Sequence, residues 1–327
     1  MLLTRSCLLL LMFALSGGAL FAQEEKPDFD ALWATGSLWQ VGDNRQKVDD
    51  ARAAIVAAGA EGRKFALTKL GVTAGLEIRC LNAVFKGWGA EAYDDLIANV
   101  AHEDTTARRN VAELLIQLDD PRAAEALLAQ ATKEAELSPR LSQLAALAKW
   151  KIEDAVPLIV EISRSETERV RHRATSLLGN YETGVAVSRL IEMLDDSVYY
   201  VRDGARNALA GATASARSAC LDSLSNELKL PAGQQNLQRI RLLLPIVASL
   251  AVEAVPGLLR QALKHESGGV RGEAADALVT WKLAPGLQNE TLDVDALLEQ
   301  AIDAEHDPYA KAAIEKARTR LGDANKK

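Results

Sequence analysis

The side chains of this 327-residue chain that best suit metal chemistry are its histidines and their acidic neighbours. His102 and His265 are each followed by a glutamate, and each lies five residues before an apolar segment. Imidazole and carboxylate groups are ligands for transition metals such as iron, so a repeated His-Glu pair is a candidate metal-binding pattern. The alternative is that both histidines are solvated residues at a helix C-terminus, where the helix dipole favours a cation.

Conventional catalytic motifs are missing from the sequence. It contains no GxSxG, no P-loop, no GxGxxG and no HExxH, and it lacks Cys-x-x-Cys and haem-attachment spacings. Beyond the N-terminal segment only Cys80 and Cys220 remain, both at apolar positions where buried thiols act as small hydrophobic groups. We therefore expect no catalytic residues, no cofactor and no metal ion.

Four aromatic residues recur at one place in a longer pattern. Each falls eleven to thirteen residues after the start of a predicted helix, at the turn before the next helix. A row of exposed aromatic side chains binds peptides or sugars, so these residues are candidates for partner binding. The alternative is that each ring covers its own helix–helix turn, which Leu118 at an equivalent position favours. The four are Trp88, Trp150, Tyr181 and Trp281.

Charged residues on a second set of predicted helices are the other candidates for partner binding. They carry both signs, and mixed charge suits a protein partner better than a polyanion. The alternative is that they form only a solvated helix face. These candidates are Arg164, Arg189, Glu192, Arg260 and Lys264.

One type of helix, predicted seven times between residues 76 and 270, would position these side chains. Each start is followed by apolar residues four, seven and eight positions on, which form one buried stripe of an α-helix. The starts are 30 to 39 residues apart, a period typical of stacked-repeat solenoids. No strand-like alternation of useful length occurs, so the chain is predicted to be all-α. The starts are Leu76, Ala107, Leu137, Val170, Val201, Ile240 and Val270.

A second helix follows each of these, marked by an apolar pair such as Leu127-Leu128. Arginine follows most of the first-helix starts, although a cation in the first turn opposes the helix dipole. Acidic residues lie just upstream, as at Asp195-Asp196, so we expect each arginine to pair with acids of the preceding inter-helix turn. The arginines are Arg108, Arg171, Arg202, Arg241 and Arg271, with Glu77 and Ser138 as exceptions.

These segments resemble the HEAT-repeat family, specifically the short variety first recognised in phycobilisome lyases. The resemblance rests on stretches such as Val201-Arg202-Asp203-Gly204-Ala205 and covers about residues 45–322. It implies an α-solenoid, a right-handed superhelix of stacked antiparallel helix pairs, with first helices on the convex side and second helices on the concave side. In that family the arginine belongs to a structural ladder between repeats. The charged candidates would then line the concave face.

Two groups of enzymes are built from similar repeats. Deoxyhypusine hydroxylases bind two irons through His-Glu pairs in the first helix, where this chain has His172-Arg173 and Gly272-Glu273, so no intact pair lies in that register. Bilin lyases act in the cytoplasm, whereas this chain has features of an exported protein. A lyase-like enzyme or cofactor-binding relative is therefore the alternative to a non-catalytic member.

The N-terminal residues are typical of a secretory signal peptide. Residues 1–5 carry one positive charge, residues 7–15 are apolar, and Ala22 is a small residue before an acidic stretch. We expect cleavage after residue 22 and export to the periplasm or the extracellular space, with a retained membrane anchor as the alternative. The expected organisation is then an apolar capping segment at residues 23–45, the solenoid at 46–322 and a polar tail at 323–327.

The formal net charge of −7 opposes non-specific binding to nucleic acid and anionic lipid. We therefore expect an exported, monomeric scaffold without catalysis and without a transmembrane span in the mature chain. A protein or peptide partner is expected on its concave face or on the aromatic turn edge. An envelope protein whose repeats self-associate is a further alternative.

Overall fold

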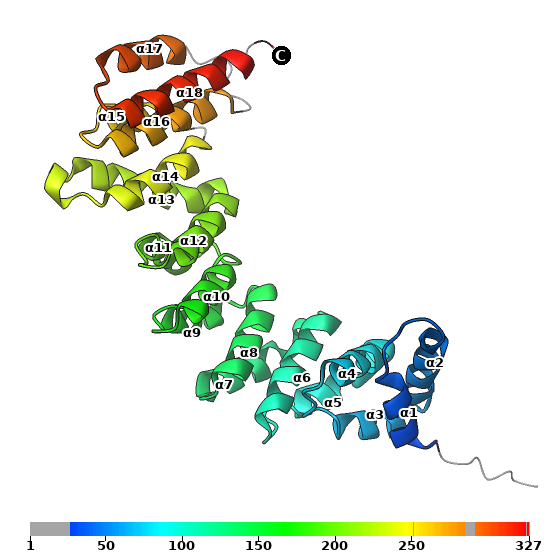
Figure 1. Cartoon of the computed structure of the whole chain (residues 1–327). Helices are drawn as coiled ribbons and strands as arrows, with labels where there is room; N and C mark the ends of the chain where they lie inside the picture. Colours follow the sequence, from blue (N-terminus) through cyan, green and yellow to red (C-terminus); the bar gives the residue numbers. More distant parts are fainter. Residues whose placement is uncertain (1–26, 251, 285–291, 325, 327) are drawn as a thin grey trace, which may run out of the picture.

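The computed structural model describes residues 27–250, 252–284, 292–324 and 326, which form a curved stack of helices (Figure 1). Within these ranges no strand is formed. The α-solenoid expected from the repeats is therefore confirmed. The predicted signal peptide, residues 1–22, lies outside the described residues, as do parts of the predicted capping segment and polar tail.

Helices account for almost all of the described chain, and short 3-10 turns precede α5, α7, α9 and α14. The helices are α1 (Phe29–Gly36), α2 (Asn44–Ala57), α3 (Gly59–Leu67), α4 (Gly75–Trp88), α5 (Tyr93–Ala98), α6 (Thr105–Leu118), α7 (Ala124–Lys133), α8 (Leu137–Lys149), α9 (Val156–Ile162), α10 (Glu168–Leu178), α11 (Gly184–Met193), α12 (Tyr199–Gly211), α13 (Ala214–Lys229), α14 (Leu237–Ala248), α15 (Ala254–Leu263), α16 (Gly268–Lys282), α17 (Val294–Ala304) and α18 (Pro308–Ala324).

The helices lie in two layers. The even-numbered helices follow the inner side of the bend and the odd-numbered helices follow its outer side (Figure 1). In several places successive even-numbered helices, such as α6 and α8 or α14 and α16, also contact one another more extensively than the neighbouring odd-numbered helices do, although α11 and α13 exceed α12 and α14. Closer packing is expected of the compressed inner side of a curved stack, so both observations agree. We call these two sets the inner layer and the outer layer.

The layer assignment reverses one expectation from the sequence. The predicted first helices are the even-numbered ones, and they form the concave inner layer rather than the convex side. From α5 onward, each odd-numbered helix packs more closely against the even-numbered helix after it than against the one before it. The repeat unit therefore begins with an outer helix. The recurring period gave the spacing of the units but not which helix leads each pair.

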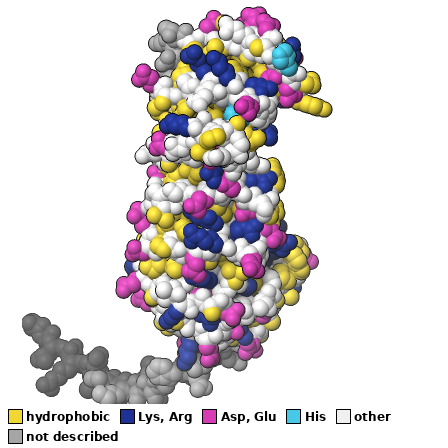
Figure 2. Space-filling view, turned by 90° about the vertical axis from the view of Figure 1, so that its left-hand side faces the viewer, with side chains coloured by type: hydrophobic (Ala, Val, Ile, Leu, Met, Phe, Trp, Pro, Cys, Tyr) yellow, Lys and Arg dark blue, Asp and Glu magenta, His cyan; other side chains and the backbone are white. Residues whose placement is uncertain are grey.

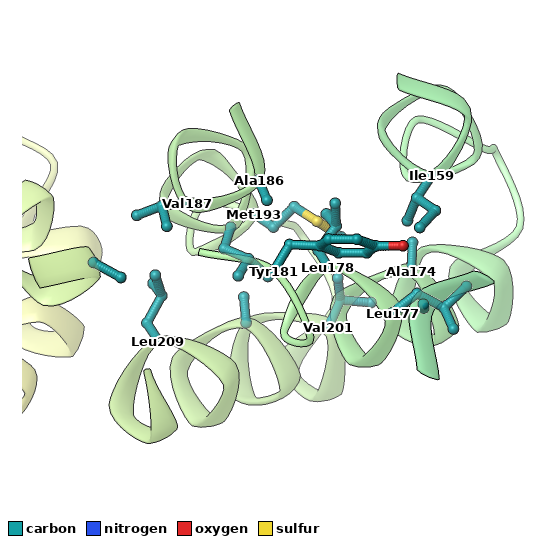
Figure 3. Packing of buried hydrophobic residues seen from close by; sticks show 14 of the residues in the cluster. Ile159, Ala174, Leu177, Leu178, Tyr181, Ala186, Val187, Met193, Val201 and Leu209 are labelled. Carbon is teal, nitrogen blue, oxygen red and sulfur yellow. The ribbon is translucent and has the colours of Figure 1, made fainter. Parts of the chain in front are cut away.

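The hydrophobic core fills the space between the two layers and runs along the stack. Ile159 of α9, Leu178 of α10, Val187 of α11 and Val201 of α12 belong to one contiguous cluster (Figure 3). Each fully buried aliphatic side chain of this kind stabilises the fold by roughly 1.5–3 kcal/mol relative to exposure. The predicted stripes occupy this core in α6, α10, α12, α14 and α16.

In α4 the predicted Cys80 and Val84 are buried, whereas Leu76 and Ala83 are only half-buried. Helix α8 departs further, because its buried stripe lies two residues later than predicted. Leu137, the predicted start, is 45% exposed. The buried residues of α8 are Pro139, Gln143, Leu144, Ala146, Leu147 and Ala148.

The α8 N-cap explains this shift. That N-cap is Glu136, so Pro139 occupies the place that Ala107 has three residues after its own N-cap, Asp104. With Pro139 as the start, the spacings around α8 become 32 and 31 residues, and Arg140 replaces the exception at Ser138.

The two ends of the described stack are covered by helices. At the N-terminal end α1 packs against α2, and the Phe29 ring stacks on Phe65 with a centroid distance of 5.2 Å. At the C-terminal end α18 lies against α16 and buries Ala310, Ile314 and Leu321. Every helix in the described ranges falls short of the length and apolar character that a membrane span needs.

Candidate functional site

The arginine that follows the helix start makes the same bonds in three repeats. Arg108 donates Nε and Nη2 to the Glu134 carboxylate at 2.6 and 2.9 Å. Its Nη1 donates to the main-chain carbonyls of His102 and Glu103, both at 2.9 Å. Bidentate pairing of this kind is among the stronger hydrogen-bonding arrangements in proteins. The equivalent pairs are Arg171 with Asp196 and Arg271 with Glu305.

These three arginine–carboxylate pairs, which we call the ladder, differ from the expectation in which turn supplies the carboxylate. The preceding turn supplies only carbonyl oxygens, whereas the carboxylate comes from the following turn, one repeat further on. Each arginine therefore connects two successive turns, and this pairing compensates for the unfavourable helix dipole. Arg202 makes only the main-chain hydrogen bonds of this pattern, because its Nη1 donates to the carbonyl oxygens of Asp196 and Ser197.

The ladder carboxylates are held ionised. Burial raises the pKa of Glu134, but hydrogen bonds from Arg108, Gln130 and the Glu136 N–H outweigh it and lower the pKa to about 2. The Arg271 hydrogen bonds likewise lower the pKa of Glu305 to about 2. A carboxylate that accepts charged and main-chain donors at once has little capacity left for a ligand, so the ladder is a structural feature.

The repeated histidines accept main-chain hydrogen bonds. Nδ1 of His102 accepts from the Asp104 N–H, and Nδ1 of His265 accepts from the Ser267 N–H, both at 2.9 Å. In both turns the imidazole thus acts as a hydrogen-bond acceptor that closes the turn. Desolvation lowers the pKa of His265, which agrees with this. Within the described ranges no three His, Cys, Asp or Glu side chains are grouped so as to hold a metal ion.

Three of the four aromatic candidates are buried. Trp88 donates its indole N–H to the Val56 carbonyl at 2.9 Å, Tyr181 is 4% exposed and Trp281 is 1% exposed. Trp150 is half-buried and donates to the Asp119 carboxylate at 3.2 Å. The hypothesis of an exposed aromatic edge is therefore wrong for Trp88, Tyr181 and Trp281, whose rings fill the core between helices.

The charged candidates lie in the outer layer. Arg189 of α11 donates to the hydroxyl and the carbonyl of Ser163 at 2.7 and 3.1 Å and pairs with Glu192, so it joins neighbouring outer helices. Arg164, Arg260 and Lys264 are exposed on or directly after α9 and α15.

These residues were expected on the concave face, and that expectation is wrong because the odd-numbered helices form the outer side. Figure 2, which faces the side of the molecule on the left of Figure 1, shows Lys and Arg interspersed with Asp and Glu. No field of one sign covers the face seen there.

A row of exposed apolar side chains occurs in the inner layer, and the sequence reasoning missed it. Its members are the first or second residues of α8, α12, α14 and α18, and we call them the apolar row: Leu137, Tyr199, Leu237 and Tyr309. The exposed fraction rises to 70% at Tyr199 and 88% at Tyr309. The available signal was an apolar residue one to three positions before a buried helix start, where the side chain does not belong to the buried stripe.

The fold and the arginine ladder define the class of protein as an α-solenoid of helical repeats. A family model described as HEAT repeats matches residues 139–210, which correspond to α8 through α12. This match and the fold support the HEAT-repeat family. No curated protein matches the chain.

Two solved structures share the fold. Importin beta superposes with a TM-score of 0.56 at 12% identity, over 90% of this chain and 48% of importin beta. Kap95p, whose binding induces the switch loops of RanGDP to adopt the GTP-bound conformation, gives a TM-score of 0.55 at 14% identity, over 90% and 42% of the two chains. This chain thus spans about half the length of these proteins, and identities this low show the fold alone.

A third similar structure is the phycocyanin lyase complex from Nostoc sp. It has a TM-score of 0.34 at 16% identity, over 73% of this chain and 95% of that one. A score at this level carries no argument about function.

Proposed function

We propose that this chain is a non-catalytic scaffold whose inner layer binds an extended segment of another protein. The observation that carries the proposal is the apolar row, four exposed side chains at equivalent ends of inner helices. Aromatic and aliphatic side chains that leave water dominate the energetics of protein interfaces. Scattered apolar residues are normal on a surface, but these four all lie at the N-terminal ends of inner helices, in α8, α12, α14 and α18.

The geometry of the row suits an extended polypeptide. Neighbouring packed helices are about 10 Å apart, so the row from α8 to α18 spans roughly 50 Å along the inner layer. An extended chain advances about 3.3 Å per residue, which makes the partner segment roughly fifteen residues long. Kap95p, a protein of the same fold, is described with RanGDP, which supports a protein as the partner class.

The proposal includes export and a monomeric state. Its support is the charged, apolar and small-residue order of residues 1–22, together with the acidic charge of the remaining chain. Mass spectrometry of the protein isolated from separated cell fractions tests export, since cleavage predicts a chain that begins at Gln23 in the exported fraction. A full-length chain found only in the cytoplasm contradicts it.

Photo-crosslinking tests the binding surface. A photoreactive residue at Tyr199 or Tyr309 is expected to capture a stoichiometric protein in the native cells, whereas the same residue at Arg260 of the outer layer is the control and captures none. The Tyr199→Ser/Tyr309→Ser double variant keeps its helical circular dichroism and loses the partner. Capture at the outer position alone contradicts the proposal. Metal analysis and absorbance spectra of the purified protein test the enzyme alternative, which a stoichiometric metal or chromophore would support.

A further inference from the structure

Helix α8 carries a second apolar stripe beside its buried one. Leu144, Ala146 and Leu147 are buried in the core, and Leu141 and Ala145 are half-buried against it. Leu137, at the start of the helix, is 45% exposed. A helix that served only the core would carry polar residues outside its buried face, so the exposed part of the second stripe offers apolar surface to a partner.

This second stripe forms the floor of a groove between α6 and α8. The groove has a volume of about 490 Å³ and is lined by Leu137, Leu141 and Ala145 of α8 and by Ile116 of α6. It lies in the inner layer, on the concave side of the stack, and it is within the size range of protein sites for small ligands. A side chain of an extended peptide segment can enter a groove of this size.

The charges of the groove are unequally paired. Glu113 accepts a hydrogen bond from Ser142 at 3.3 Å and lies 3.9 Å from Arg109. Arg173 of α10 lines the groove and is exposed. In the described part of the chain Arg173 makes no ion pair or hydrogen bond, and Arg169 one turn earlier makes none either. An acidic chain thus presents one unpaired cation, Arg173, at the edge of the groove.

We infer that the groove takes an aliphatic side chain of an acidic peptide segment, with a neighbouring carboxylate of that segment paired to Arg173. This inference rests on the proposed scaffold function and adds the chemistry of the partner. The apolar floor selects the side chain, and the unpaired guanidinium selects the charge beside it, because a bidentate Arg–carboxylate pair has a fixed geometry. Leu137 belongs to both the groove and the apolar row, so the acidic segment is continuous with the extended partner.

Selection from a display library of random eight-residue peptides on the purified chain tests the inference. Peptides enriched on the wild-type chain are expected to combine aliphatic residues with Asp or Glu. The affinity of one enriched peptide, carrying a fluorescent label, is then measured by fluorescence anisotropy. Arg173→Glu is expected to weaken its binding about tenfold or more, equivalent to at least one lost charge pair. Leu137→Ser weakens it severalfold, and Arg260→Glu on the outer layer leaves it unchanged.

Several outcomes overturn the inference. They are the absence of enrichment, enrichment of basic peptides, and equal binding to the wild-type chain and the Arg173→Glu variant. Self-association of the chain that Leu137→Ser abolishes in sedimentation velocity would assign the groove to a second copy instead. Both substituted side chains are exposed, and unchanged circular dichroism shows that the variants fold. If the photoreactive residue at Tyr199 captures a protein while the groove variants have no effect, the scaffold function stands and only this assignment fails.

Discussion

Replacing Tyr181 by phenylalanine should stabilise the protein. The Tyr181 ring lies between α10 and α11, and its hydroxyl points among apolar side chains near Ala174 and Ile159 (Figure 3). The hydroxyl oxygen is buried and has no hydrogen-bond partner within the described part of the chain. Desolvation of this group raises its pKa to about 12.

The magnitude follows from the cost of burying an unpaired hydroxyl. Mutational data place that cost at about 1–3 kcal/mol, and Tyr181→Phe removes it. The substitution leaves a void no larger than a methyl group, which costs about 1 kcal/mol. We therefore expect a net stabilisation of about 0–2 kcal/mol, or an increase in melting temperature of up to a few degrees for a chain of this size.

Tyr93 provides a matched control with the opposite sign. It is 1% exposed, but its hydroxyl donates to the Asp120 carbonyl and accepts from the Ala123 N–H at 2.9 Å. Tyr93→Phe leaves a buried N–H unpaired, so a destabilisation of about 1–3 kcal/mol is expected. Urea denaturation of the wild type and both variants measures the two changes. A destabilised Tyr181→Phe protein would refute the reasoning, because it would mean that the hydroxyl is bonded in the folded state.

The pH dependence gives a second measurement on the same variant. Below pH 10 the tyrosine is neutral in both states, so its ionisation does not affect stability. Between pH 10 and 12 Tyr181 ionises only in the unfolded state, which favours unfolding as the pH rises. The stability advantage of Tyr181→Phe is therefore expected to grow across this interval.

Three further predictions concern the ladder and the core. Glu134 and Glu305 have folded-state pKa values of about 2 against an ordinary 4.5. Their contribution to stability is therefore complete above pH 4.5 and is lost as the pH falls toward 2. Urea midpoints at pH 7 and pH 3 measure the loss, and Glu134→Gln should reduce the difference between the two midpoints. Arg171→Met leaves the Asp196 carboxylate without its partner and should lower the stability by about 3–5 kcal/mol. Arg241→Met removes a half-exposed pair with Glu273, 3.3 Å apart, and should lower it by only about 0–1 kcal/mol. Equal losses of stability in thermal unfolding would contradict the structural role of the ladder. Trp281→Ala removes a fully buried side chain and should cost about 3–5 kcal/mol; an unchanged melting temperature would show that the ring is not part of the core.

The repeated helix could be predicted from the sequence because one physical requirement determines its pattern. Ala107, Val170, Val201 and Val270 all begin buried stripes, as their spacing indicates. The order of the layers could not be predicted in this way, because periodicity says which face of a helix is buried but not on which side of the neighbouring layer the helix lies. That choice depends on how successive pairs rotate against each other, so Arg164 and Arg260 were placed on the wrong face.

The aromatic candidates failed for a related reason. Trp281 and Tyr181 occur at a recurring place, and recurrence identifies an equivalent environment without saying whether that environment is wet or dry. A large aromatic side chain can fill the space at a turn between the two layers just as it can bind a partner on the surface. Exposed rings are distinguished instead by lying outside the buried stripe, as Tyr199 does two residues before Val201 and Tyr309 does one residue before Ala310.

The misassigned register of α8 is informative because two apolar stripes compete in that helix. Leu137, Leu141 and Ala145 fit the repeat pattern as well as Pro139, Ala146 and Leu147 do, and the Glu136 cap decides between them. Leu141 and Ala145 still pack against the core, but Leu137 adds exposed apolar surface, and the surplus stripe adds ambiguity of register. Local rules tend to be broken where a protein performs a function, and here the surplus stripe lies beside the unpaired Arg173. The feature that misleads the prediction of the core is thus the one that locates the groove.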